Sequence, residues 1–195
     1  MTFKQIAQRI RVPAGFALAP LLFISARPSS SSLASGAFVA VIGLAIRAWA
    51  SGHLKKNQEL ATSGPYAHTR NPLYLGTFLL GMGVAIGSGA LWFVAVFAAV
   101  YLSIYVPVML AERDTMRNLF PDEYEEYRKQ VPLFVPRFTP YSGYTATSYA
   151  AQLKRRPKWK AGPQFELSLY LRHREYRAAV GFAVIYALLA TKMFL

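Results

Sequence analysis

The sequence predicts an all-α integral membrane protein with about five transmembrane helices and a helical cytoplasmic segment. Hydrophobic residues make up 54% of its 195 residues and charged residues only 16%, a balance that soluble domains rarely show. Several apolar runs approach the length of about 20 residues that a helix needs to cross the bilayer. Positive charges gather in the segments between these runs, as expected for cytoplasmic loops.

Five apolar runs are expected to span the membrane, at residues 12–26, 33–51, 72–87, 90–111 and 178–195. The fourth run is free of charge, and only a Gly-Ser-Gly turn separates it from the third, which predicts a tight helical hairpin. Gly83 and Gly87 indicate close helix packing, because no strand precedes them as in a dinucleotide-binding motif. Arg47 interrupts the second run and Lys192 the fifth, where the lysine stem can carry its ammonium to the far interface.

The charges also predict the orientation of the chain. With the N-terminus in the cytoplasm, the thirteen basic residues from 113 to 177 fall inside, whereas Arg27 and Lys192 fall outside with the C-terminus. The net charge of +13 then reflects topology and attraction to anionic lipid headgroups rather than nucleic-acid binding. The first 26 residues also resemble a signal peptide, but the later spans favour a retained helix.

The connections between the spans carry further predictions. Residues 28–32 are expected to form an exposed turn, and residues 53–71 a polar cytoplasmic connection. After the fourth span the helix is expected to continue to about Asn118 and to restart after Pro121. Three prolines then predict an extended path over 131–140.

Two regions follow from this pattern. Residues 1–137 are expected to form a membrane core with polar segments at 63–76 and 110–137, and residues 138–195 a basic interfacial extension plus the last span. Within the extension, the basic run at 154–160 is expected to anchor the chain at the interface, and residues 164–177 to form a surface helix.

The two ends of the predicted hairpin return to one membrane face, where their polar residues can form one site. Before the third span lie Tyr66, His68, Arg70, Asn71 and Tyr74. Asn71 is expected to cap a helix that starts at Pro72, and a helix N-terminus favours an anionic group such as a carboxylate. After the fourth span come Glu112 and Arg113. Because a glutamate at the end of an apolar span is costly without a partner, the two segments together suit a zwitterion.

These residues also admit structural interpretations. Arg70, Arg113 and Arg117 can mark the cytoplasmic boundary, and the tyrosines at 66, 74, 124 and 127 can be interfacial aromatics. His68 can be a solvated loop residue. The three histidines have no metal-ligand spacing and the chain has no cysteine, so a metal site is not predicted.

The residues themselves resemble a known family. Gly64-Pro65-Tyr66, Arg70-Asn71-Pro72 and Tyr74 are followed by Glu112, by FPDEYEEY from residue 120 and by VPLFVP from residue 131. This order and spacing resemble the isoprenylcysteine carboxyl methyltransferase and phospholipid methyltransferase superfamily, over residues 63–137. The chain departs from the family pattern at Asn71, where histidine is usual, at Pro121, where glycine is usual, and in having a single glutamate before Arg113.

The resemblance implies methyl transfer from S-adenosylmethionine to a lipophilic acceptor, either a membrane lipid or a small molecule. The implied cofactor-binding residues are Gly64, Tyr66, His68, Arg70, Asn71, Pro72, Tyr74, Glu112 and Tyr124, with Glu112 facing the cofactor ammonium. Arg70 or Arg113 would orient a carboxylate acceptor, and Glu112 or His68 would deprotonate an amine acceptor. Two alternatives stay open: a NADPH-dependent reductase related to sterol reductases, and a non-catalytic membrane protein that retains the fold.

Overall fold

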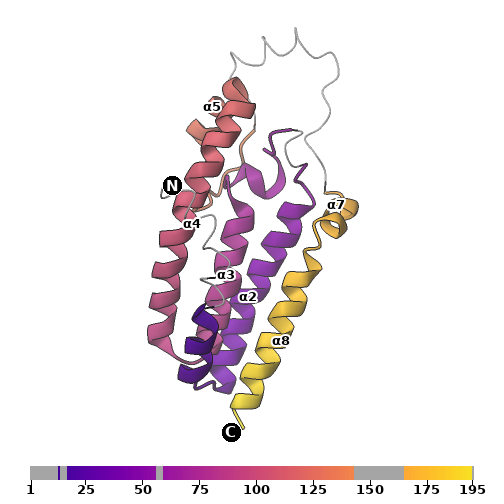
Figure 1. The fold of residues 1–195 in the computed structure, drawn as a ribbon. Helices are drawn as coiled ribbons and strands as arrows, with labels where there is room; N and C mark the ends of the chain where they lie inside the picture. Colours follow the sequence, from indigo (N-terminus) through magenta and orange to yellow (C-terminus); the bar gives the residue numbers. More distant parts are fainter. Residues whose placement is uncertain (1–12, 14–16, 56–58, 143–164, 195) are drawn as a thin grey trace.

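The computed structural model describes residues 13, 17–55, 59–142 and 165–194, and every regular element within them is a helix. A helix at residues 17–25 comes first. It is followed by α2 (Ser30–Ser51), the 3₁₀ helix η1 (Gly64–Ala67), α3 (Pro72–Gly87), α4 (Leu91–Leu119), α5 (Pro121–Gln130), α7 (Leu167–Arg172) and α8 (Tyr176–Lys192). The long helices α2, α3, α4 and α8 lie side by side, with α5 at one end of the bundle (Figure 1). The predicted all-α class is confirmed.

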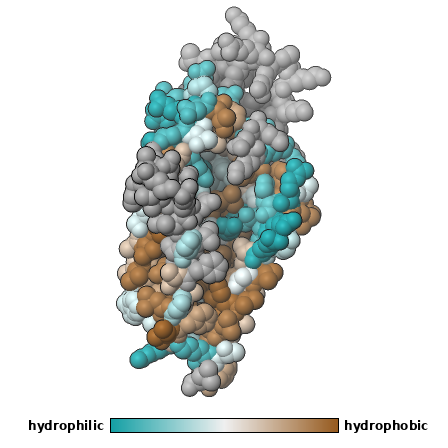
Figure 2. All heavy atoms as spheres, in the orientation of Figure 1, coloured by the Kyte–Doolittle hydropathy of each residue, from teal (hydrophilic) through white to brown (hydrophobic). Residues whose placement is uncertain are grey.

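Two of the described helices, α2 and α4, are long and apolar enough to cross a membrane, and α3 is a shorter apolar helix. The helix at 17–25 is the described part of the expected first span, and α8 covers the expected last one. Figure 2 shows hydrophobic side chains over the middle and lower part of the molecule and hydrophilic ones over α5 at the top. This distribution matches a bundle that lies in a bilayer with one polar end.

Helices α2 and α3 approach closely because glycines face each other along their contact. A Cβ atom on Gly83 would lie 2.5 Å from the carbonyl oxygen of Gly36 and 2.6 Å from the amide nitrogen of Ala40. Lower residue volume lets membrane helices pack backbone against backbone. The predicted packing role of Gly83 is therefore confirmed, and its partner surface is α2.

The turn between α3 and α4 is as tight as predicted. Ser88 caps the end of α3 with right-handed backbone angles, and Gly89 has a φ of +73°, which L side chains rarely adopt. The carbonyl oxygen of Ser88 accepts a 2.7 Å hydrogen bond from the amide of Arg27. This bond ties the first connection of the chain to the hairpin turn at the same end of the bundle.

The expected turn at residues 28–32 is wrong in part, because α2 already begins at Ser30. Ser29 caps the helix: its side chain accepts from the amide of Ser32, and the Ser32 side chain accepts from the amide of Ser29. This reciprocal pair is a capping box, with serine in the place that glutamate usually takes. The serine run therefore starts the helix instead of forming a separate loop.

Helix α4 continues far beyond its apolar part, as predicted, and ends at Leu119. Pro121 starts α5, where its missing N–H is no loss. Acidic residues occupy the first turn of α5 and basic residues the last, which complements the helix dipole. The α4–α5 pair thus projects a charged helical element from the bundle.

Parts of the extension lie outside the described residues, among them the predicted interfacial anchor at 154–160. Where a surface helix was expected at 164–177, the structure has the short α7 and then the start of α8. Phe165 contacts His53 with ring centroids 6.1 Å apart, and the amide of Glu166 donates to the carbonyl of Gly52 at 2.9 Å. These contacts place α7 against the end of α2.

Candidate active site at the polar end of the helical hairpin

The two polar ends of the α3–α4 hairpin meet directly. The hydroxyl of Tyr74, in the first turn of α3, donates a hydrogen bond to Glu112 Oε1 at 2.5 Å. A hydroxyl donating to a carboxylate at this distance is a strong, charge-assisted interaction. The two segments that the sequence assigns to one site therefore lie on the same side of the bundle and in contact.

Arg70 brings α5 to the same place. Its Nη1 donates to the Tyr124 hydroxyl at 3.0 Å, and its guanidinium carbon lies 6.0 Å from the centre of that ring. The Nε of Arg70 is buried and has no protein partner. A buried donor without an acceptor is costly, so this atom marks a position where an anionic group would be stabilised.

The segment after α5, residues 131–141, holds the loop before α3 through backbone hydrogen bonds, and we call it the clamp segment. The amide of Arg70 donates to the carbonyl of Pro132 at 3.0 Å. The amides of Arg137 and Tyr141 donate to the carbonyls of His68 and Ala67, each at 2.9 Å. The proline-rich path predicted over 131–140 is thus an extended segment that fixes the positions of the site residues.

Asn71 does not cap α3, and that part of the prediction is wrong. It occupies the N-cap position without a side-chain cap, and its Nδ2 instead donates to the carbonyl of Leu133 at 2.9 Å. The clamp segment offers the asparagine a carbonyl that the sequence pattern does not reveal. Pro72 is nevertheless the first residue of the helix, as expected, and is buried.

The tyrosines at 66, 124 and 127 are buried, so the interfacial-belt interpretation is wrong for these three. The Tyr127 hydroxyl donates to the carbonyl of Tyr66 at 2.6 Å. Burial raises the pKa of Tyr66 well above its usual value, and the negative charge of Glu112 adds to the effect. Burial likewise raises the pKa of Tyr127, so both hydroxyls stay protonated, and that of Tyr127 serves as a neutral donor.

Gly64 and His68 shape the loop around η1. Gly64 has a φ of +56°, and a Cβ atom on it would lie 2.7 Å from Nε2 of His53, so only glycine fits. Nδ1 of His68 lies 2.8 Å from the carbonyl oxygen of Arg137. His68 is thus held by the clamp segment and is not a freely solvated loop residue.

Arg113 does not join this group. Its Nε and Nη2 donate to the neighbouring Asp114 at 3.0 and 2.9 Å, and its side chain is 41% exposed. Arg117 pairs in the same way with Glu125 at 3.0 Å. The catalytic role of Arg113 stays a prediction that no contact with the other site residues supports.

An apolar cavity of about 410 Å³ lies beside this site, between α3, α4, α8 and the helix at 17–25. Thr77, Tyr101 and Tyr105 line it. The Tyr101 hydroxyl donates to the carbonyl of Tyr74 at 2.8 Å, and the ring of Tyr105 lies 5.4 Å from that of Tyr74. Two residues that line the cavity thus contact Tyr74, although neither Tyr74 nor Glu112 lines it.

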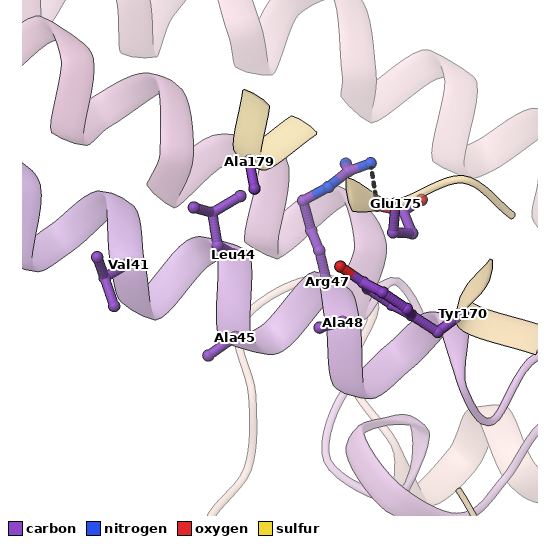
Figure 3. Close-up of a pocket in the computed structure, with 8 residues that line it drawn as sticks. All are labelled: Val41, Leu44, Ala45, Arg47, Ala48, Tyr170, Glu175 and Ala179. Carbon is purple, nitrogen blue, oxygen red and sulfur yellow. Dashed lines mark hydrogen bonds and ion pairs between the residues drawn. The ribbon is translucent and has the colours of Figure 1, made fainter. Parts of the chain in front are cut away.

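A second polar contact, missed in the sequence, joins α2, α3 and the start of α8. Nη2 of Arg47 pairs with Oε2 of Glu175 at 2.6 Å (Figure 3). Nη1 of Arg47 donates to the Thr77 hydroxyl. Arg47 is an isolated charge within an apolar run, which is costly unless it is paired, whereas Glu175 lies among arginines just before the last run. This signal was in the sequence and could have suggested the pair.

No group of three or more His, Asp or Glu side chains that could hold a metal ion occurs among the residues that the structure describes. The polar side chains that converge at the hairpin are instead one carboxylate, one guanidinium and several phenols. Such a set recognises the charged ends of an organic zwitterion: a carboxylate by arginine and an ammonium by glutamate.

Comparison with known proteins points to methyltransferases. The family model for phospholipid methyltransferases matches residues 34–123. The protein-S-isoprenylcysteine O-methyltransferase of Schizosaccharomyces pombe is 32% identical over 84 residues, which are 42% of this chain and 36% of that protein. No solved structure matches the chain.

Two relatives carry metal-resistance names. The cobalt-zinc-cadmium resistance protein CzcN of Cupriavidus metallidurans is 32% identical over 143 residues, 68% of this chain and 64% of that protein. The nickel-cobalt-cadmium resistance protein NccN of Alcaligenes xylosoxydans xylosoxydans is 29% identical over 106 residues, 53% of this chain and 48% of that protein.

The chain therefore spans less than two thirds of the length of each of these three relatives. The matched family segment nevertheless contains α3, Arg70, Tyr74 and Glu112, which form the site described above. Over residues 34–123 this chain thus matches the phospholipid methyltransferase family, and it is similar to an isoprenylcysteine methyltransferase of the same superfamily of membrane methyltransferases.

Proposed function

We propose that this protein transfers a methyl group from S-adenosylmethionine to a lipophilic acceptor that enters from the membrane. The observation that carries the proposal is the Tyr74–Glu112 hydrogen bond beside the apolar cavity, which joins a zwitterion-recognising site to a space for a hydrocarbon chain. A donor that is charged and an acceptor that is apolar need this combination of environments.

The residues present fit the amino-acid end of the donor. The unpartnered Nε of Arg70 can donate to its carboxylate, and the Glu112 carboxylate, oriented by Tyr74, can accept from its ammonium. Gly64, His68, Asn71, Pro72 and Tyr124 shape this site by the contacts described above. Tyr66 adds a wall whose hydroxyl stays neutral.

When bound, S-adenosylmethionine would supply a methyl group bonded to a positively charged sulfur. The acceptor's lone pair bonds to the methyl carbon, and the carbon–sulfur bond breaks as the neutral thioether leaves. The chain's own contribution is to hold the acceptor atom in line and to exclude water, which is worth several orders of magnitude in rate. The aromatic walls at Tyr101 and Tyr105 keep this region apolar. For an amine acceptor, the Glu112 carboxylate or the ring of His68 would take the proton.

We further propose that the helix at 17–25 together with α2, α3, α4 and α8 forms five membrane spans, with the N-terminus and the site in the cytoplasm. At 1.5 Å per residue, α2 is about 33 Å long and matches a hydrocarbon core of roughly 30 Å. Helices α3 and α8, with 16 and 17 residues, lie near the lower limit for a span. The basic residues of α5 and of the clamp segment support the cytoplasmic placement of this end.

Two measurements on detergent-purified protein test the proposal. Calorimetric titration should show binding of S-adenosylmethionine and no binding of NADPH, since a reductase would bind the second ligand. Incubation with methyl-labelled S-adenosylmethionine and a membrane lipid extract should then label a lipid-soluble product. Binding of the donor without any transfer would instead favour a non-catalytic protein, and binding of NADPH alone would overturn the assignment.

A further inference from the structure

One wall of the apolar cavity comes from α8, which lies outside the segment that matches the phospholipid methyltransferase family. Ala178, Gly181, Phe182 and Ile185 line it. Their spacing of three, four and seven residues places them on one face of the helix. Residues of α4 line the same cavity, so this face of α8 and that part of α4 border one space.

Gly181 is the unusual member of this wall. A Cβ atom built on it meets nothing within 4 Å, whereas those on Gly36 and Gly83 would meet the backbone of the neighbouring helix. Gly181 also lies inside a regular helix and has no positive φ, so neither close packing nor backbone conformation requires a glycine. Glycine inside a helix costs about 1 kcal/mol relative to alanine. Gly181 is exposed, so it lines the cavity at the open side, and the absence of a side chain there leaves this opening wide.

The position of α8 is fixed at the end of the cavity next to the site. Glu175 precedes α8 and pairs with Arg47 of α2 (Figure 3). Arg47 also donates to Thr77, which lines the cavity from α3. The side chains of Arg47 and Glu175 are only 20% and 12% exposed. An ion pair shielded to this degree holds the start of α8 against α2, because separating the two residues would leave a poorly solvated charge.

We infer that α8 is the specificity wall of the acceptor cavity and that Gly181 sets the bulk of the hydrocarbon chain that the acceptor carries. The inference rests on the proposed function, since it names the determinant of that reaction's acceptor. A volume of about 410 Å³ lies in the lower part of the range of roughly 300–1,000 Å³ for pockets that hold one small molecule. A side chain at the exposed Gly181 would narrow the opening of this space and exclude the bulkier chains.

The test uses cis-parinaric acid, a fluorescent single-chain fatty acid, as a probe of the cavity in detergent-purified protein. Gly181→Phe should weaken its binding at least tenfold, and Gly181→Ala should weaken it less. Val184→Phe is the matched control: it adds the same ring three residues along the helix, at a side chain that is 55% exposed and does not line the cavity. This control should bind the probe as the unaltered protein does.

Each variant is also titrated with S-adenosylmethionine and unfolded by heat, so that a folding defect is recognised. Wild-type probe affinity in Gly181→Phe would overturn the inference, and so would an equal loss in Val184→Phe. Failure of the unaltered protein to bind S-adenosylmethionine would instead count against the proposed function, because the probe measurement needs no donor. Selective loss of probe binding with unchanged donor affinity is the expected result.

Discussion

At the scale of single residues, the site depends on polar side chains that find their partners in distant parts of the chain. Tyr74 reaches Glu112, and Arg70 reaches Tyr124. Each pair joins a residue next to α3 with one that follows the apolar part of α4. The sequence could indicate these residues because charged and phenolic groups beside apolar runs need partners.

Which atom meets which atom could not be predicted in the same way. The sequence assigns Asn71 to the cap of α3, which is a local role. In the structure its side-chain amide instead donates to the backbone carbonyl of Leu133. The carbonyl that attracts it belongs to a segment placed by α5 and by the prolines after it. Local capping rules describe an isolated helix end and lose their force when a tertiary partner competes.

The Arg47–Glu175 pair gives a prediction on stability. Glu175→Gln keeps the shape of the side chain but leaves the Arg47 guanidinium without its counter-charge. Removing one member of a buried pair costs up to about 3–5 kcal/mol, a value that partial exposure of both groups reduces. Thermal unfolding followed by circular dichroism should therefore show a lower midpoint for this variant.

The double variant Arg47→Met with Glu175→Gln is the control for that prediction. It removes both charges, so it should unfold at a higher temperature than Glu175→Gln alone. A midpoint for Glu175→Gln equal to that of the unaltered protein would show that the pair does not hold α8.

At the scale of the elements, the sequence predicted the ends of helices more accurately than the contacts between them. Pro72 and Pro121 start α3 and α5 as predicted, because proline at a first helical position acts locally. The apolar cavity was not predicted, since it takes its walls from α3, α4, α8 and residues 18–23, far apart in the chain. In the sequence, apolar residues that line a cavity cannot be distinguished from apolar residues that face lipid.

The contact between α2 and α3 gives a prediction about packing. Gly83→Val would place side-chain atoms against the backbone of Gly36 and Ala40, so the two helices would have to separate. Overpacking of this kind typically costs about 1–3 kcal/mol. The variant should show a lower thermal midpoint, whereas Gly181→Val, in open space, should unfold near the temperature of the unaltered protein. Equal midpoints for the two variants would contradict the close contact.

At the scale of the whole molecule, the proposed function places the site at one membrane face and the α3–α4 turn at the other. The hydrophobic middle and the polar α5 end in Figure 2 support this arrangement. The distribution of lysine and arginine predicts which face is cytoplasmic, because this bias acts on loops during insertion. Composition alone thus predicts the topology, while the shape of the site needs coordinates.

Single-cysteine labelling can test this topology without background, since the chain has no cysteine. Phe138→Cys lies in the clamp region at a fully exposed position, and Ser31→Cys lies at the exposed start of α2. In sealed inside-out vesicles, a membrane-impermeant maleimide should label the first variant and leave the second unlabelled. The opposite pattern would invert the topology, and labelling of both would exclude a bilayer between them.

The central claim is that the polar ends of α3 and α4 form the binding site for the methyl donor, and the affinity of Glu112→Gln measures it most directly. Glutamine can still accept from Tyr74, so the fold should persist while the charge that faces the donor ammonium is lost. Loss of a hydrogen bond to a charged group costs about 1.5–3 kcal/mol.

In calorimetric titration with S-adenosylmethionine, Glu112→Gln should therefore show a dissociation constant roughly 10- to 150-fold higher than that of the unaltered protein. Glu123→Gln is the control, because it removes the same charge from an exposed position on α5 and should bind as the unaltered protein does. An unchanged affinity in Glu112→Gln, with the protein folded, would contradict the proposed site.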